Sequence, residues 1–248
     1  MMNRFHAFIH LAGKRRLKMK RLFQITTLVV SVAAFSQPAL QVVTVNTEDA
    51  MAYVSWAQSA APVFAKINDL PGAIGTCLPG AGAEEEGDAY WWSLAPSHAN
   101  LLTGSARDPA VLKEVEKVED IRTVRERDIW SVVKSSDRVL AAGDTYAAWN
   151  ILVETDSLAE YLAVLNALEA AYHSNGFDDV HIAAYRVNTG DYSGNIMVSS
   201  SAPTPERIGA VMDALEEPWA QESMMQFEGM RKWIRGTTLQ CQVHVVNQ

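Results

Sequence analysis

Val45–Glu48 (VNTE) and Val153–Asp156 (VETD) are two similar stretches that lie 108 residues apart in the chain. Each precedes a tyrosine, Tyr53 or Tyr161, by the same number of residues, and each opens a segment with the composition of a helix. A repeat distance of about 100 residues is too long for one unit of a solenoid and has the size of a small domain. The sequence therefore predicts one small domain that occurs twice.

Hydrophobic periodicity predicts the same order of elements around both stretches. In the first copy we expect a helix over 47–67, a helix broken near Pro109 over 97–120, and strands at 40–45, 73–78, 89–94 and 123–133. In the second copy we expect a helix over 157–175, a broken helix over 205–234, and strands at 148–153, 180–187, 194–199 and 239–246. Each copy therefore has the order β-α-β-β-α-β of a ferredoxin-like unit.

One such unit leaves a face of its sheet uncovered, and two units can cover each other. The predicted fold class is therefore α+β, with two ferredoxin-like βαββαβ repeats packed sheet to sheet as a pseudo-dimeric α+β barrel. The predicted boundaries are repeat 1 at 37–136, a linker at 137–147 and repeat 2 at 148–248. Because one chain would supply both halves, we expect a monomer.

This order of elements and the internal repeat resemble the dimeric α+β barrel superfamily in a single-chain form. The resemblance points to its antibiotic-biosynthesis monooxygenase-like and stress-responsive barrel proteins, and it covers nearly all of residues 37–248. It depends on architecture and on the repeat, because no residue-level signature of the family occurs in the sequence. The space between the sheets is the usual small-molecule or haem site in that superfamily, so the resemblance implies a pocket there.

The N-terminal residues have the features of a secretory signal. Residues 1–21 carry seven basic residues and no acid, Leu22–Phe35 is a mainly apolar run of 14 residues, and Ala34–Ser36 offers small residues for cleavage. Such an order is typical of a signal peptide, and the apolar run is shorter than the ~20 residues of a transmembrane helix. We therefore predict a signal peptide at 1–36, with Met19 as an alternative start, and a periplasmic or secreted protein.

Removal of this segment makes the protein strongly acidic. The chain has 21 basic and 29 acidic residues, and loss of the seven basic residues leaves 14 against 29, a net charge of −15. A net negative charge opposes binding to nucleic acid and to anionic membranes. We therefore expect a small molecule as the partner, with no nucleic acid and no membrane after cleavage.

Cys77 and Cys241 are the two cysteines, one in each copy. In an oxidising compartment two cysteines either pair or stay buried as inert thiols, and the sequence leaves both alternatives open. No C-x-x-C motif occurs, so we predict neither a zinc site nor redox chemistry, and no metal.

Strand alternation selects candidate ligand-binding residues, because successive side chains of a strand face opposite sides of the sheet. The barrel-facing candidates are Tyr90, Trp92, Asn150, Tyr185 and Gln242. The aromatic residues could stack on a flat ligand or simply fill the core. Asn150 could bind a ligand carbonyl or satisfy a neighbouring backbone group.

His181 and His244 are the candidate catalytic residues, because we assign both to the barrel face of their strands. A histidine there could act as a general base or as a haem ligand. The alternative is a structural histidine with a satisfied hydrogen bond, and no partner can be placed from the sequence.

The sequence contains no Gly-x-Ser-x-Gly elbow, no His-Glu-x-x-His, no phosphate loop and no Rossmann fingerprint. These absences argue against a serine hydrolase, a zinc protease and a nucleotide-dependent enzyme. We predict a secreted barrel that binds a small apolar or aromatic molecule, with cofactor-independent monooxygenase-like activity as the enzymatic interpretation. The alternatives are a non-enzymatic binding or interaction protein and a haem-binding barrel, and the sequence does not decide between enzyme and binding protein.

Overall fold

The computed structural model describes residues 36–67, 72–104 and 106–247. The predicted signal segment lies outside the described residues apart from Ser36. Among the described helices, none combines the length and the hydropathy needed to cross a membrane.

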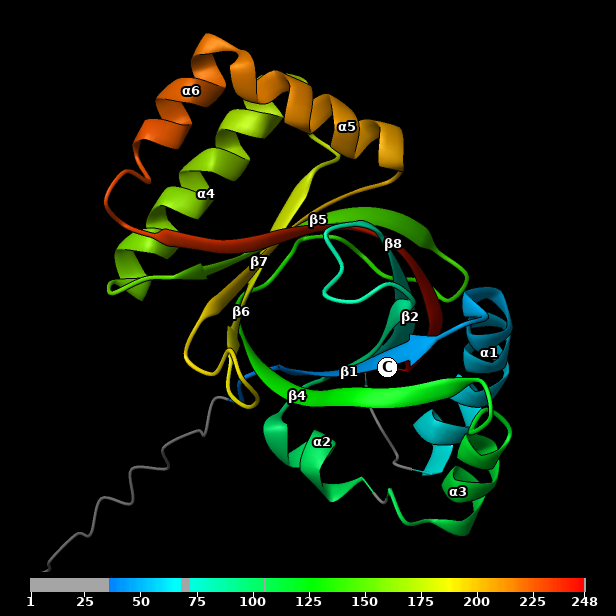
Figure 1. The fold of residues 1–248 in the computed structure, drawn as a ribbon. Helices are drawn as coiled ribbons and strands as arrows, with labels where there is room; N and C mark the ends of the chain where they lie inside the picture. The colour runs from blue at the N-terminus through cyan, green and yellow to red at the C-terminus, as the bar shows by residue number, and fades with distance from the viewer. Residues whose placement is uncertain (1–35, 68–71, 105, 248) are drawn as a thin grey trace, which may run out of the picture. The chain divides into compact units, whose positions relative to one another are not determined.

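Eight strands form one closed antiparallel barrel in the order β1-β3-β2-β8-β5-β7-β6-β4 (Figure 1). The strands are β1 (Ala39–Thr47), β2 (Gly72–Ala81), β3 (Asp88–Ala95), β4 (Arg122–Lys134), β5 (Thr145–Glu154), β6 (His181–Val187), β7 (Ile196–Ala202) and β8 (Lys232–Asn247). Two pairings, β2 with β8 and β4 with β6, join the two halves and close the barrel.

The prediction of two ferredoxin-like repeats stacked sheet to sheet is wrong. The edges of the two expected sheets are hydrogen bonded to each other, β2 to β8 and β4 to β6, so the strands enclose a single barrel. Free edges expose unpaired N–H and C=O groups, and closure satisfies them. β8 is 16 residues long, which lets it pair with both β2 and β5.

Helices cover the outside of the barrel in two groups (Figure 1). One group is α1 (Ala50–Ile67), α2 (His98–Thr103) and α3 (Pro109–Glu116); the other is α4 (Leu158–Ser174), α5 (Pro205–Asp213), the 3-10 turn η1 (Ala214–Glu216) and α6 (Pro218–Met225). The broken helices expected from the sequence are thus pairs of short helices. Asp108 and Thr204 cap α3 and α5 through their side chains, and a proline follows each cap at the first helical position.

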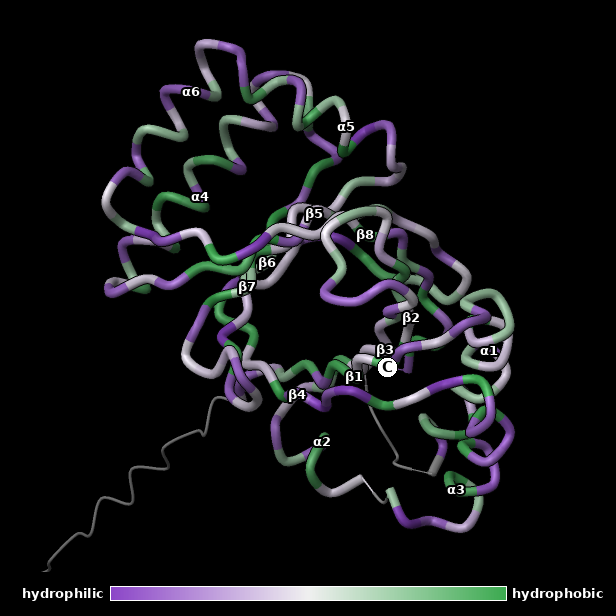
Figure 2. The backbone as a smooth tube through the Cα atoms, in the orientation of Figure 1, coloured by the Kyte–Doolittle hydropathy of each residue, from purple (hydrophilic) through white to green (hydrophobic). Residues whose placement is uncertain are grey.

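The hydrophobic residues form three clusters, one under each group of helices and one inside the barrel. Figure 2 shows hydrophobic and hydrophilic residues alternating along the helices and strands, as expected for elements with one buried face. Tyr53 and Tyr161, which follow the two similar stretches, are 1% and 0% exposed and lie in the two helix-covered clusters. They are therefore core residues and not candidates for the site.

Candidate functional site

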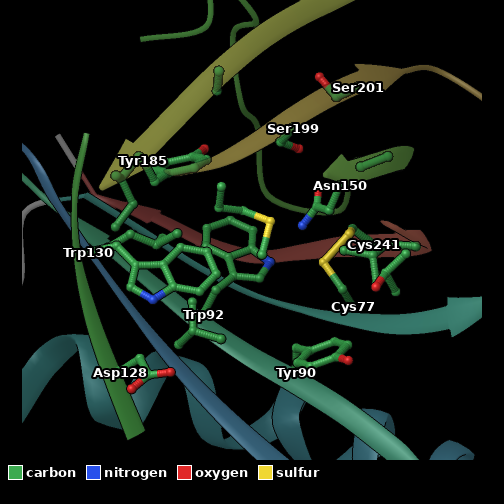
Figure 3. A pocket seen from close by; sticks show the side chains of 18 of the residues that line it. Cys77, Tyr90, Trp92, Asp128, Trp130, Asn150, Tyr185, Ser199, Ser201 and Cys241 are labelled. Atoms are coloured by element: carbon green, nitrogen blue, oxygen red, sulfur yellow. A yellow bond between two sulfur atoms is a disulfide. The ribbon is translucent and has the colours of Figure 1, made fainter. Parts of the chain in front are cut away.

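The interior of the barrel contains a cavity of about 410 Å³ (Figure 3). Its walls are mainly apolar, and its largest residues are aromatic. Side chains at every second position of the strands reach it, as the alternation of a strand requires. The apolar wall includes Leu40, Val42, Leu94, Val132, Leu140, Ala148, Leu152, Ala183 and Leu239.

Aromatic side chains from four strands line the cavity: Tyr90 and Trp92 on β3, Trp130 on β4, Tyr146 on β5 and Tyr185 on β6. The rings of Trp130 and Tyr185 lie 6.0 Å apart between centroids. Burial raises the pKa of Tyr90 and of Tyr185 to about 12, so both hydroxyls are neutral near pH 7. The cavity therefore offers ring faces and neutral hydroxyl groups.

Gly75 on β2 lets the Trp92 indole lie against the strand. A Cβ atom at this position would collide with the six-membered ring of Trp92 and with the backbone oxygen of Gln242. Glycine at position 75 therefore leaves the space that the Trp92 ring occupies in the wall.

Four buried polar atoms of the wall have no hydrogen-bond partner among the described residues: the indole Nε1 of Trp92, the indole Nε1 of Trp130, Nε of Arg138 and Oδ1 of Asn150. Buried polar groups in proteins are nearly always hydrogen bonded, and an unsatisfied one costs about 1–3 kcal/mol. Their presence in one wall suits a cavity that receives polar atoms from a bound molecule.

Two carboxylates of β4, Glu126 and Asp128, also line the cavity. Asp128 is 8% exposed, and Thr189 Oγ1 donates a long hydrogen bond to it at 3.4 Å. Burial raises the pKa of both carboxyl groups, and the negative charge of Asp128 raises that of Glu126 further. Sequence reasoning missed this pair, although Glu126, Asp128, Trp130 and Val132 alternate on one face of a predicted strand.

Glu84, in the β2–β3 loop, also lines the cavity. Tyr192 Oη donates a hydrogen bond to Glu84 at 3.0 Å, and Arg235 forms an ion pair with the same carboxylate. Tyr192 lies in the β6–β7 loop and Arg235 near the start of β8, so Glu84 connects the β2–β3 loop to both. In Figure 1 the β2–β3 loop lies across the barrel opening.

Cys77 and Cys241 form a disulfide that lines the cavity (Figure 3). They are directly opposite each other on β2 and β8, with Cα atoms 4.0 Å apart. Of the two alternatives left open by the sequence, the structure has the paired one. The bond crosses one of the two strand pairings that close the barrel.

The structure brings together four of the five predicted ligand-binding residues: Tyr90, Trp92, Asn150 and Tyr185 all line the cavity. Gln242 does not, because Leu239 and Cys241 occupy the interior face of β8. The orientation predicted for β8 is therefore reversed. Its apolar residues were assigned to the helices, but the barrel interior is apolar as well, and period alone does not distinguish two apolar environments.

Neither predicted catalytic histidine lines the cavity. His244 faces outward on β8, where its Nε2 lies 2.9 Å from Thr76 Oγ1, and burial lowers its pKa. His181 begins β6, where β4 and β6 separate, and its ring lies 6.1 Å from that of His173 on α4. The two histidines are also on different strands and are not part of one site.

Glu169, His173 and His181 form a cluster outside the cavity, with one ligand atom from each within 4.8 Å of the others. The Glu169 carboxylate already accepts a hydrogen bond from the Ile182 N–H at 2.7 Å and pairs with Lys134 at 2.6 Å. The lysine charge balances the carboxylate and opposes a cation. The cluster therefore has a structural explanation, and we assign no metal to it.

No protein-family model matches this sequence, and no curated protein sequence matches it. Similarity appears among solved structures. A proposed monooxygenase of Lactobacillus acidophilus aligns over 86% of this chain and 97% of its own, with a TM-score of 0.56 and 14% identity. A proposed monooxygenase of Fusobacterium nucleatum aligns over 86% and 95%, with a TM-score of 0.55 and 6% identity.

A dye-decolorizing peroxidase of Bacteroides thetaiotaomicron aligns over 84% of this chain and 94% of its own, with a TM-score of 0.53 and 8% identity. These neighbours are dimeric α+β barrel proteins, and the present chain has the same fold. At such low identities the likeness concerns the fold alone.

Proposed function

We propose that this protein binds a small apolar or aromatic molecule inside the barrel and acts on it as a monooxygenase-like enzyme without a bound organic cofactor. The observation that carries the proposal is the cavity of about 410 Å³ with aromatic walls and unsatisfied polar atoms. Its size lies in the range of about 300–1,000 Å³ that is typical of small-molecule sites. Two structural neighbours named as monooxygenases support the reaction class.

The wall residues define what such a molecule would look like. A flat ring would pack against Trp92 and Trp130, since aromatic surfaces favour offset or edge contacts with other rings. A carbonyl or hydroxyl oxygen on that ring would accept hydrogen bonds from the unsatisfied indole N–H groups, and a hydroxyl group would donate one to Asn150 Oδ1. The neutral hydroxyl of Tyr185 adds a further donor or acceptor. An aromatic ketone or phenol meets these requirements.

A haem group fits the described residues less well. Histidine is the common protein ligand of haem iron, and none of the described histidines lines the cavity. The thiols of Cys77 and Cys241 are taken up by the disulfide. Ligation by Tyr185 would need its phenolate, and burial raises its pKa to about 12. Haem titration followed by absorption spectroscopy separates the alternatives, because an axially ligated haem would give a shifted Soret band.

We also propose that the protein is exported and that its two halves arose by duplication of one unit. The disulfide is supporting evidence for an oxidising compartment, where such bonds persist, and hence for the periplasmic or secreted location. Equivalent strands occupy equivalent places in the two halves of the barrel, β4-β1-β3-β2 and β8-β5-β7-β6, which supports duplication of one unit around the linker 137–147. One chain closes the barrel, so we infer a monomer.

Filling the cavity should abolish ligand binding. Ala148 on β5 is 2% exposed and lines the cavity, so Ala148→Phe would place a ring in the space that a ligand needs. We expect the affinity for 2-naphthol, measured by isothermal titration calorimetry, to fall at least about tenfold, or about 1.4 kcal/mol. Thr145→Phe is the matched control, because Thr145 begins the same strand and is exposed.

Both variants should unfold at temperatures close to that of the wild type, since the added ring at 148 enters existing space. Equal binding of 2-naphthol by wild type and Ala148→Phe would place its site outside the barrel. A wild type that binds neither 2-naphthol nor a co-purified molecule in native mass spectrometry would favour the non-enzymatic interaction protein.

A further inference from the structure

We propose that Glu126 and Asp128 are the proton-accepting end of the cavity and that they remove an acidic C–H proton from a bound aromatic ketone. The proposal rests on the function proposed above and adds the substrate class and the residues that act on it. In this step the C–H bond next to the carbonyl breaks, its electron pair stays on the ligand as an enolate, and the proton bonds to a carboxylate oxygen. No oxidant takes part in this step.

The strand geometry places both carboxylates at the ligand. Glu126 and Asp128 are two residues apart on β4, so they share the interior face with Trp130 and Val132. Figure 3 shows Asp128 beside Trp130 and on the same side of the cavity as Tyr90. Glu126 pairs in register with Thr44 of β1, another residue of the cavity wall. A ring against Trp130 would therefore have a carboxylate next to it.

These two carboxylates differ from the other acids nearby in having no cationic partner within the described part of the chain. Glu84 pairs with Arg235, and Asp88 pairs with Arg125 at 2.7 Å. The guanidinium groups at this end of the barrel are thus engaged by other acids. A carboxylate that is not neutralised by an ion pair keeps its basicity and can accept a proton.

The surroundings of both carboxyl groups raise their pKa values above those of free side chains. Burial raises the pKa of Asp128, the Thr189 hydroxyl lowers it, and the negative charge of Asp191 raises it. For Glu126, burial and the charges of Asp128, Asp191 and Asp88 raise the pKa, while Arg125 lowers it. A general base is most effective when its pKa approaches the working pH. Both shifts have the direction that a base in this position needs.

Trp92 supplies an independent sign that a ligand with an oxygen acceptor belongs here. It lines the cavity, its side chain is 7% exposed, and its indole Nε1 has no partner among the described residues. Removal of a proton next to a carbonyl places negative charge on the carbonyl oxygen. A buried N–H donor stabilises such an oxygen most when the charge develops, because water does not compete for it. The cavity thus contains both a proton acceptor and unpaired N–H donors.

Hydrogen–deuterium exchange of 2-tetralone in D₂O without oxygen tests the proposal. The readout is loss of the ¹H NMR signal at the carbon between the ring and the carbonyl, which needs proton removal and no oxidation. We expect the wild-type protein to accelerate this exchange about 100-fold or more over buffer, the usual contribution of a general base. Glu126→Gln and Asp128→Asn should each slow it, and the double variant should return it to the buffer rate.

Glu222→Gln is the matched control, because Glu222 is an exposed acid of α6 that does not line the cavity. Its exchange rate should stay within about twofold of the wild type, as a surface substitution has little effect on a buried site. If the double variant still binds 2-tetralone by calorimetry and exchanges it at the wild-type rate, the inference is wrong and the binding function stands. If the wild type binds neither 2-tetralone nor 2-naphthol, the proposed function itself fails.

A stability measurement checks the same residues without any ligand. An acid with a raised pKa in the folded state disfavours folding when it is ionised, so its cost is present at high pH and disappears as the pH falls below its folded pKa. Asp128→Asn should therefore raise the melting temperature at pH 8 and leave it nearly unchanged at pH 4. A lower melting temperature at pH 8 would indicate a structural role for Asp128 and would contradict a strained, unpaired base.

Discussion

Replacing both cysteines of the Cys77–Cys241 disulfide with alanine is expected to lower the free energy of unfolding by about 3–5 kcal/mol. The bond joins residues 164 positions apart, so it restricts a very long loop in the unfolded chain. Chain-entropy estimates give about 4.7 kcal/mol for a loop of about 100 residues, and measured values are commonly lower. Both cysteines are also buried, at 6% and 4% exposure, and their loss enlarges the cavity. Urea unfolding monitored by tryptophan fluorescence measures the change.

Reduction of the wild-type protein provides the control for this prediction. Wild type in a strong thiol reductant should approach the stability of the double alanine variant, whereas the variant should not respond to the reductant. The urea dependence of the unfolding free energy should also increase, because an unfolded chain without the cross-link exposes more surface. A double variant within about 0.5 kcal/mol of the wild type would mean that the β2–β8 pairing holds the barrel closed without the bond.

Replacing Arg125 with methionine is expected to destabilise the fold by about 3 kcal/mol, because it leaves the Asp88 carboxylate buried without its cation. The Asp88 side chain is fully buried, and both of its oxygens accept hydrogen bonds from Arg125, at 2.8 and 2.7 Å. The backbone N–H of Glu85 adds one hydrogen bond at 3.0 Å. Removing one partner of such a pair is more costly than removing both, and Arg125 is partly exposed, so the lower part of the usual range applies.

The double variant Asp88→Asn/Arg125→Met is the control, since a neutral amide costs less to bury than an unpaired carboxylate. It should be more stable than Arg125→Met alone in thermal unfolding. Equal stability of the two variants would show that water or another group compensates Asp88. Arg125 also contacts Glu85 at 3.0 Å, so its loss should loosen the β2–β3 loop, which lines the cavity through Glu84. Faster release of 2-naphthol by Arg125→Met would report that loosening.

Much of the candidate site could be predicted from strand alternation. Tyr90, Trp92, Asn150 and Tyr185 were predicted to face the barrel and do line the cavity, because each lies in a short strand with a clear period of two. The prediction for Gln242 and His244 is wrong because it assigns the apolar residues of β8 to the helices. In the structure the apolar residues Leu239 and Cys241 line the cavity, so Gln242 and His244 face outward. The same alternation rule, applied to 123–133, puts Glu126 and Asp128 on one face with Trp130, and only the closed barrel shows that this face lines the cavity.

The sequence by itself determined the local features of this protein: the order of its strands and helices, and the interior-facing positions of Tyr90, Trp92, Asn150 and Tyr185. These depend on residues close in the chain, whose periodicity and chemistry are visible in the sequence. Only the tertiary structure decided that β2 pairs with β8 and β4 with β6, that Cys77 meets Cys241, and that two carboxylates share the cavity with unpaired indole nitrogens. The reason is physical: those contacts join distant residues, and their gain depends on which edges and faces are left unsatisfied after every other element has packed.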